Sequence, residues 1–333
     1  MALIFVDSFD HYPTADLSEK WGGLASHTIT TGGRFGTSST RRTINLANLW
    51  RTLPNLPTIT CGFAWKWTSA AAGATSNSIA SFREATTIQV EVRALSSGQL
   101  RVSAGPNTYD STQITLPDTW YFIELTAVIH ASAGSFELRV NGETWLSQTG
   151  IDTTNTANNY ATRFYFGNTG GSGTAGTMDY DDLYIRDDGT FLGDCRVAYL
   201  APNGNGNHSD FTGSDADSTD NYLLVDEASN SEADYVESST VGHIDTYAMG
   251  SLPSTPSTIH GVQQVVNARK TDASVVNMRH VIRQGGTNYE GSDVAVGDSS
   301  AFLTRVLETD PDTAAAWTGS GIDSMESGQK VQS

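Results

Sequence analysis

Cysteine, basic residues and long apolar runs are all scarce in this chain of 333 residues. Two cysteines far apart, Cys61 and Cys195, exclude a disulfide framework and favour small buried side chains in a reducing compartment. Lys and Arg number 19 against 37 Asp and Glu, and the formal net charge of −18 argues against nucleic-acid binding. No run approaches the roughly 18 apolar residues of a membrane span, so we expect no membrane insertion. The opening MALIFVDSFDHY lacks the basic region of a signal peptide.

Familiar catalytic motifs are missing as well. The seven histidines are dispersed, and neither an H-x-x-x-H pair nor a C-x-x-C is present, which argues against a zinc site. There is no G-x-S-x-G elbow and no Walker A loop. We therefore predict no catalytic residues, no enzymatic activity and no cofactor other than the calcium considered below.

Short segments with alternating apolar and polar residues run along most of the chain. The clearest is the stretch 119–145, in which Phe136, Leu138 and Val140 alternate with polar residues. Asn141-Gly142 then supplies the pair that a tight type I′ hairpin turn needs. Further alternating runs lie at 61–67, 88–92, 100–102, 164–166 and 180–186. Strands at this spacing predict an antiparallel sandwich or jelly roll.

Helix is expected only as short turns. Asp16–Trp21 is one candidate, and Asp312–Trp317, which follows Pro311 and can be capped by Asp310 or Asp312, is the other. No segment has a sustained period of 3.6 residues.

The length favours two domains, and the composition changes between Asp187 and Asp194. The polar run Pro202–Asn221 follows, and then three more alternating runs at 259–268, 275–283 and 301–307. We predict an all-β fold with an antiparallel jelly roll or β-sandwich in residues 1–190. Residues 191–333 are expected to form a second, smaller β-rich domain.

Several segments carry a resemblance to known proteins. TWYFIEL with SFELRVNGETW resembles the middle of concanavalin A-like, or laminin-G-like, jelly rolls, and YDDLYIRDDG resembles their closing strand. The stretches DSFDHY, ADLSEKW and FLGDCRVAYLAPNGNGN, with the ending AAWTGSGIDSMESGQKV, resemble tailed-bacteriophage virion structural proteins. In those proteins such a jelly roll precedes a second β-rich domain.

This resemblance implies a non-enzymatic surface component of a virion that assembles in the host cytoplasm. It would be a tail fibre, a tail tip or a capsid-decorating subunit. Its expected partners are other virion proteins, further copies of itself, with a trimer favoured, and a host surface glycan. One alternative is a carbohydrate-binding lectin module. Another is a polysaccharide-degrading hydrolase, against which the absence of that family's E-x-D-x-x-E pattern counts.

Two clusters of aspartates are candidates for calcium. Asp179, Asp181 and Asp182 lie in one strand, and carboxylate oxygens are what Ca²⁺ takes as ligands. The alternative is an exposed polar strand face. A second cluster, Asp215, Asp217 and Asp220, lacks the glycine and the terminal glutamate of an EF-hand loop, and a polar turn is its alternative.

Aromatic rings are the candidates for sugar stacking. We predict glycan contacts at Trp145 and Tyr160, with Trp50, Trp120 and Tyr165 also available. Packing across strands is the alternative for Trp145, which closely follows the hairpin turn.

Overall fold

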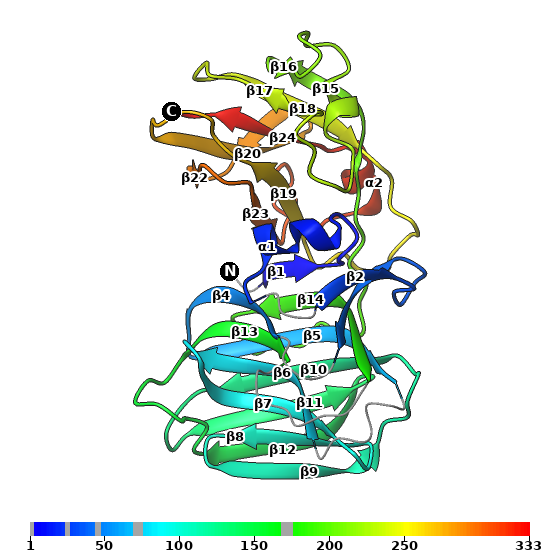
Figure 1. The fold of residues 1–333 in the computed structure, drawn as a ribbon, viewed down its shortest axis with the longest axis vertical. Coiled ribbons are helices and arrows are strands. Elements are labelled where there is room, and N and C mark those ends of the chain that lie inside the picture. The colour runs from blue at the N-terminus through cyan, green and yellow to red at the C-terminus, as the bar shows by residue number, and fades with distance from the viewer. Residues whose placement is uncertain (1–2, 24–26, 44–47, 69–75, 168–175) are drawn as a thin grey trace. The chain divides into compact units, whose positions relative to one another are not determined.

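The computed structural model describes residues 3–23, 27–43, 48–68, 76–167 and 176–333 (Figure 1). The chain divides into two compact units. The first comprises Met1–Asp10 and Trp21–Val197, and the second comprises His11–Lys20 and Ala198–Ser333. The division therefore falls after Val197 instead of after residue 190, and a short N-terminal segment belongs to the second unit.

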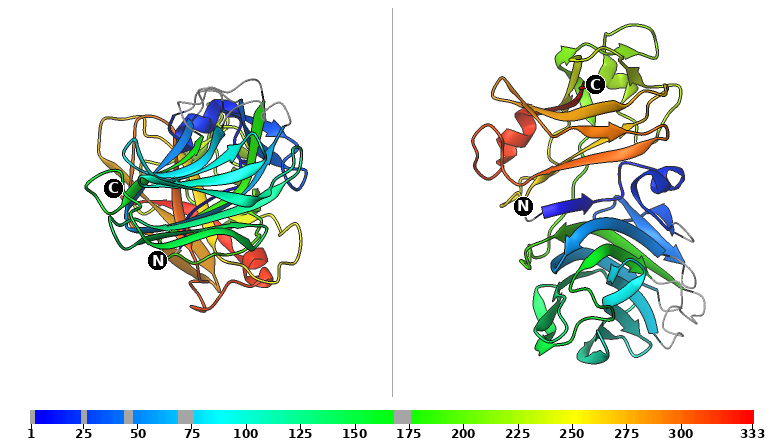
Figure 2. Two further views of the ribbon diagram at one scale, coloured as in Figure 1. Left: turned by 90° about the horizontal axis from the view of Figure 1, so that it is seen from below. Right: turned by 90° about the vertical axis from the view of Figure 1, so that its left-hand side faces the viewer.

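The first unit is a sandwich of two antiparallel sheets (Figure 2). Sheet A has the order β12-β11-β10-β5-β14-β3-β2, and β1 also pairs with β14. Sheet B has the order β4-β13-β6-β7-β8-β9. The strands of sheet A are β1 (Leu3–Asp7), β2 (His27–Thr31), β3 (Ser38–Thr43), β5 (Thr58–Trp67), β10 (Tyr121–Val128), β11 (Gly134–Val140), β12 (Glu143–Ile151) and β14 (Thr177–Arg186). Those of sheet B are β4 (Asn48–Leu56), β6 (Ser76–Glu84), β7 (Thr87–Leu95), β8 (Gln99–Ala104), β9 (Asn107–Ile114) and β13 (Ala161–Gly167).

The core of this sandwich forms because alternate residues of each strand point to the same side. Phe63 of β5 is fully buried, and its ring centroid lies 6.4 Å from Phe164 and 5.0 Å from Phe166 on β13 of the opposite sheet. Burial of an aromatic side chain of this size contributes roughly 1.5–3 kcal/mol. The predicted all-β fold with an antiparallel sandwich is confirmed.

The hairpin between β11 and β12 has the predicted turn. Val140 pairs with Glu143, so only Asn141 and Gly142 connect the strands. Their φ angles are 51° and 82°, as a type I′ turn requires. The side-chain oxygen of Asn141 also accepts a hydrogen bond from the backbone N–H of Phe122, at 2.8 Å.

The second unit contains three small antiparallel sheets and short helices (Figure 1). Its largest sheet has the order β15-β18-β24-β20-β21, with β22 also paired to β20, and the other two are the pairs β16-β17 and β19-β23. Its strands are β15 (Pro202–Ser209), β16 (Thr212–Gly213), β17 (Val236–Glu237), β18 (Ile244–Met249), β19 (Val262–Ala268), β20 (Val276–Gln284), β21 (Thr287–Glu290), β22 (Val294–Val296), β23 (Ala301–Leu307) and β24 (Glu326–Val331). Its helical turns are η1 (Thr14–Asp16), α1 (Leu17–Lys20), η3 (Asn221–Leu224) and α2 (Gly319–Ser324).

The first part of the polar run that begins at Pro202 forms β15 and pairs with β18, and every residue of β15 is half-buried or exposed. One local prediction for the second unit needs correction. The helix expected at Asp312–Trp317 is wrong, because helix α2 starts only after Thr318. The Thr318 hydroxyl accepts a hydrogen bond from Gly321 N–H at 3.0 Å and so caps this later helix. The turn expected near Asp16–Trp21 is present as η1 and α1.

No helix among the described residues is long and apolar enough to cross a membrane. Cys61 is buried and Cys195 is half-buried, and both are free thiols.

Candidate functional site

The outer face of sheet A is occupied by the chain's own exit segment, defined here as residues 188–197. Leu192 N–H donates a hydrogen bond to the Tyr184 hydroxyl at 3.1 Å. Gly193 N–H donates to the Glu124 carboxylate at 2.8 Å, and the Tyr184 hydroxyl donates to the same carboxylate at 2.5 Å. These bonds hold the exit segment against β10 and β14, so this part of sheet A is covered.

Of the predicted calcium candidates of β14, Asp182 contacts the end of this segment. Asp182 Oδ1 accepts a hydrogen bond from Val197 N–H at 2.8 Å, and Asp181 Oδ2 accepts one from Arg34 N–H at 2.8 Å. Asp179 forms an ion pair with Lys66 at 3.3 Å. The three carboxylates therefore bind three different groups of the first unit and do not converge on one point.

Burial raises the pKa of both Asp181 and Asp182, and the neighbouring Asp182 carboxyl raises that of Asp181 further. Both residues are 1–2% exposed, far from the exposed strand face considered as the alternative. The described part of the chain has no group of three or more His, Cys, Asp or Glu side chains placed to share a metal ion. In the second cluster, Asp215 and Asp217 accept hydrogen bonds from nearby backbone N–H groups, and Asp220 accepts one from Asn205.

The outer face of sheet B has a different character. Phe164 and Phe166 of β13 face the core, so the intervening Tyr165 points to the opposite side. Strand pairing places one residue of each strand beside Tyr165 in a single row across the sheet. The row consists of Trp50, Tyr165, Ser81, Glu91, Ser103 and Thr108.

Four arginines flank this row. Arg163 and Arg83 pair across β13 and β6 on one side of it, and Arg93 and Arg101 pair across β7 and β8 on the other. We call the row and these four arginines the arginine face. Six strands about 4.8 Å apart make the row roughly 24 Å long.

The aromatic end of the arginine face is closely packed. The Trp50 and Tyr165 ring centroids are 6.2 Å apart. The guanidinium of Arg163 lies 4.3 Å from the Trp50 ring centroid, and that of Arg83 lies 4.2 Å from the Tyr165 ring centroid. Gly22 is needed beside them, because a Cβ there would lie 2.2 Å from the Trp50 ring.

The other end of the face is charged and partly buried. Arg93 donates to Glu91 Oε2 at 3.2 Å, and Arg101 forms a two-point ion pair with Asp110 at 2.6 and 2.7 Å. Glu91 is only 1% exposed. Its Oε1 atom and the Nε of Arg93 are buried and have no hydrogen-bond partner within the described residues. Buried polar atoms are normally paired, so these two add to the polar atoms of the described residues that lack a partner.

The two predicted glycan residues lie elsewhere. Trp145 is on β12, where Leu138 pairs with Leu146 and Arg139 pairs with Thr144, so Trp145 is the extra residue of a β-bulge. Tyr160 immediately precedes β13. Both are half-buried, and neither belongs to the arginine face.

The sequence contained a signal for part of the arginine face. Arg93 and Arg101 lie at equal distances from the turn 96–98, so a hairpin there places them opposite each other. Arg83 and Arg163 offered no such signal, because their strands are far apart in the sequence.

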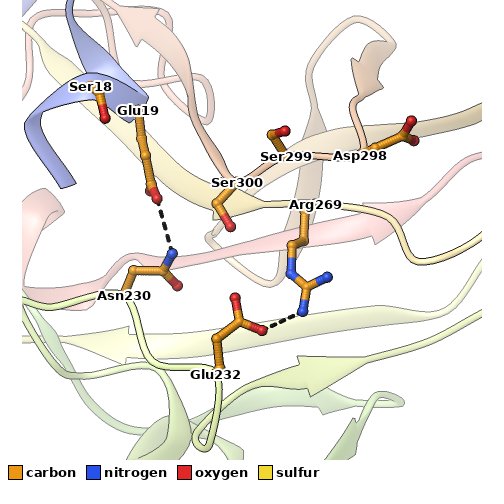
Figure 3. A pocket seen from close by; sticks show the side chains of 8 residues that line it. All are labelled: Ser18, Glu19, Asn230, Glu232, Arg269, Asp298, Ser299 and Ser300. Carbon is orange, nitrogen blue, oxygen red and sulfur yellow. Dashed lines mark hydrogen bonds and ion pairs between the residues drawn. The ribbon is translucent and has the colours of Figure 1, made fainter. Parts of the chain in front are cut away.

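A polar pocket of about 580 Å³ lies in the second unit (Figure 3). Its charged groups already have partners. Glu19 accepts from Asn230 at 3.1 Å, Glu232 pairs with Arg269, and Asp298 lies 3.3 Å from Lys270. The remaining lining residues are Ser18, Ser299 and Ser300. This pocket offers hydroxyls and satisfied charges, without a group poised for chemistry.

No family model and no curated protein sequence matches this chain. Solved structures resemble it at the level of fold. One is a sialidase, with 10% identity and a TM-score of 0.43, covering 56% of this chain and 18% of that one. The alginate lyase Aly36B has 13% identity and a TM-score of 0.42, covering 59% of this chain and 98% of its own. The binding domain of Paraclostridial Mosquitocidal Protein 1 has 15% identity and a TM-score of 0.37, covering 50% of this chain and 44% of its own.

These matches correct one prediction. We expected a protein without enzymatic activity because catalytic motifs are missing, yet the similar structures include sialidases and alginate lyases, which are enzymes. The motifs sought in the sequence therefore do not suffice to exclude catalysis. The similarity itself is one of fold and assigns no activity to this chain.

Proposed function

We propose that the first unit binds a carbohydrate chain on the arginine face. The observation that carries this proposal is the row of Trp50, Tyr165 and polar side chains that strand pairing places across sheet B. Sugars present flat apolar faces together with many hydroxyls. A binding site for them therefore needs aromatic rings and fixed hydrogen-bonding groups. The half-buried Trp50 ring and the hydroxyls of Ser103 and Thr108 supply these at the surface, whereas Tyr165, Ser81 and Glu91 are at most 3% exposed and support them from beneath.

The rigidity of the face supports the proposal. Arg163 donates to the Tyr165 hydroxyl at 3.2 Å, and Arg83 donates to the Ser81 hydroxyl at 2.9 Å. These side chains are held by one another, so a ligand would find them already oriented and little rotamer entropy would be lost on binding.

We also propose that this binding serves a virion surface protein. The support is the sequence resemblance to tailed-phage structural proteins. A tail fibre, tail tip or capsid decoration would use such a face to attach to a host surface glycan, and would hold other virion proteins through surfaces elsewhere. A carbohydrate-binding module outside any virion would use the same face.

A glycan array probed with the full chain tests the binding proposal. We expect W50A to lose binding and W145A to keep it, because only Trp50 lies on the arginine face. Arg163→Gln is a second variant that leaves the Trp50 packing in place. The melting temperature of each variant shows whether it is folded. Retained binding by folded W50A and R163Q, with loss in W145A, would move the site to β12. The bound polysaccharide is also analysed for chain shortening, which reports any cleavage.

A further inference from the structure

The arginine face contains two pairs of arginines in directly opposed positions. Arg163 is registered against Arg83, and Arg93 against Arg101. Residues opposed in this way have Cβ atoms about 4.5–5.5 Å apart, and like charges there destabilise a sheet. The chain carries only 19 Lys and Arg, yet four of them gather on one face.

The two pairs differ in how their charge is balanced. Arg93 and Arg101 have Glu91 and Asp110 as ion-pair partners. Within the described residues, Arg163 and Arg83 have no ion pair with a carboxylate, and their bonds go to hydroxyls and backbone carbonyls. The Arg83 side chain is mostly buried, and its charge is therefore only weakly screened by water.

Resting on the proposed function, we infer that the ligand of this face is an anionic polysaccharide that carries carboxylates on its sugars. A carboxylate fits the planar fork of a guanidinium with two parallel hydrogen bonds. One carboxylate near Arg163 and Arg83 would offset their repulsion. A second would lie near Arg93, whose side chain is 25% exposed and whose guanidinium is paired with the buried Glu91.

The positive charge of the arginine face contrasts with the negative charge of the chain as a whole. Four arginines stand against two carboxylates on this face, whereas the formal net charge of the whole chain is −18. An acidic protein repels an anionic polymer at long range, and salt screens that repulsion within about 8 Å at physiological ionic strength. Binding must therefore depend on short-range contacts at the arginines, and moderate salt should not abolish it.

The test uses the full chain and three immobilised polymers, alginate, polygalacturonate and hyaluronan, each beside a copy whose carboxylates have been reduced to alcohols. Dextran and dextran sulfate form a further pair that separates carboxylate recognition from general attraction to anions. Binding is measured by biolayer interferometry at low and physiological salt. The variants are Arg163→Gln and Arg93→Gln. The matched control is Arg139→Gln, because Arg139 forms a similar surface ion pair with Glu137 on sheet A.

We expect at least one carboxylated polymer to bind at least ten times more tightly than its reduced copy. Arg163→Gln and Arg93→Gln should each weaken binding about tenfold or more, while Arg139→Gln leaves it unchanged. Equal binding of a polymer and its reduced copy would overturn the inference and leave the proposed carbohydrate binding intact. Dextran sulfate bound as tightly as the carboxylated polymers, with no effect of the arginine variants, would also overturn it. Binding to none of these polymers, and to no glycan on the array, would overturn both proposals.

Discussion

Asp181 and Asp182 are adjacent buried carboxyls on β14, and the backbone between them is irregular. Asp182 has a φ of 51°, and the register of β14 against β5 shifts between Asp181 and Tyr184. This bulge allows the two neighbouring side chains to bind different segments, Asp181 the loop at Arg34 and Asp182 the exit segment.

The buried pair predicts that stability falls as pH rises. Burial and the neighbouring carboxyl raise the pKa of Asp181 to about 8, above its ordinary value of 3.8. The folded state then keeps a proton that the unfolded state has released. Its stabilising effect is complete below pH 4 and is lost as the pH rises through the folded-state pKa. We expect Asp181→Asn to reduce the loss of stability between pH 5 and pH 8 by about 1–3 kcal/mol.

Urea unfolding at several pH values measures this effect. Asp110→Asn serves as the control, because the ion pair with Arg101 lowers the pKa of Asp110 and its titration lies below this range. A pH slope in Asp181→Asn equal to that of the unmodified chain would show that Asp181 is ionised in the folded state.

A substitution at Gly142 measures the cost of backbone strain separately from any change in side-chain packing. Its φ is 82°, and a Cβ built there would have no atom within 4 Å. Gly142→Val should therefore destabilise the first unit only through its backbone conformation, by about 1–2 kcal/mol. Thermal unfolding measures this, and Gly204→Ala, at a glycine whose φ is not positive and whose added Cβ would touch only the Ala248 side chain at 3.7 Å, is the control. An unchanged melting temperature in Gly142→Val would mean that the turn relaxes to another type.

At the scale of elements, the segment His11–Lys20 completes the second unit. The Tyr12 ring lies 5.4 Å from the Phe302 ring on β23, measured between centroids. Glu19 accepts hydrogen bonds from Asn230 at 3.1 Å and from Asn267 at 2.5 Å. A segment remote in sequence thus binds both a loop and the two-stranded sheet β19-β23.

Tyr12→Ala should destabilise the two-stranded sheet β19-β23. Tyr12 is 2% exposed, and removal of a buried aromatic side chain costs about 3–5 kcal/mol. Hydrogen exchange followed by mass spectrometry should show faster exchange in β19 and β23, with β5 unchanged. Tyr235→Ala is the control, because Tyr235 is 42% exposed in the same unit. Faster exchange in β5 instead would contradict this placement of the N-terminal segment.

At the scale of the whole molecule, charge is the dominant property. Because each chain has a net charge of −18, electrostatic repulsion between copies opposes their association. We still predict a homo-oligomer, with a trimer favoured, because the virion surface protein that we propose would gain binding strength from symmetric repetition of weak contacts. Its interface should avoid the acidic runs at 179–188 and 210–220. Light scattering across a salt series should show association that persists or strengthens up to physiological salt. A monomer at every concentration and salt level would contradict self-assembly.

Much of the fold could be predicted from the sequence, and much of the candidate site could not. Alternation located the strands at 61–67, 136–140 and 180–186, because a period of two residues is a local property. The prediction of a helix at Asp312–Trp317 was wrong, because whether so short a segment forms a helical turn depends on its capping residue and its tertiary contacts. The glycan contact at Trp145 stays a prediction, and it rests on the position of this residue beside a turn, which does not determine the sheet face that its side chain shares with other residues.

The sequence by itself determined the strands with clear alternation, such as those at 61–67 and 136–140, because a period of two residues is a local property of the chain. It also determined the hairpin at Asn141-Gly142, whose turn depends on two adjacent residues. Only the tertiary structure decided that Arg163 lies opposite Arg83 and that Asp182 holds Val197. Contacts between residues so distant in sequence depend on which strands pair and in what register, and burial of the whole core settles that choice.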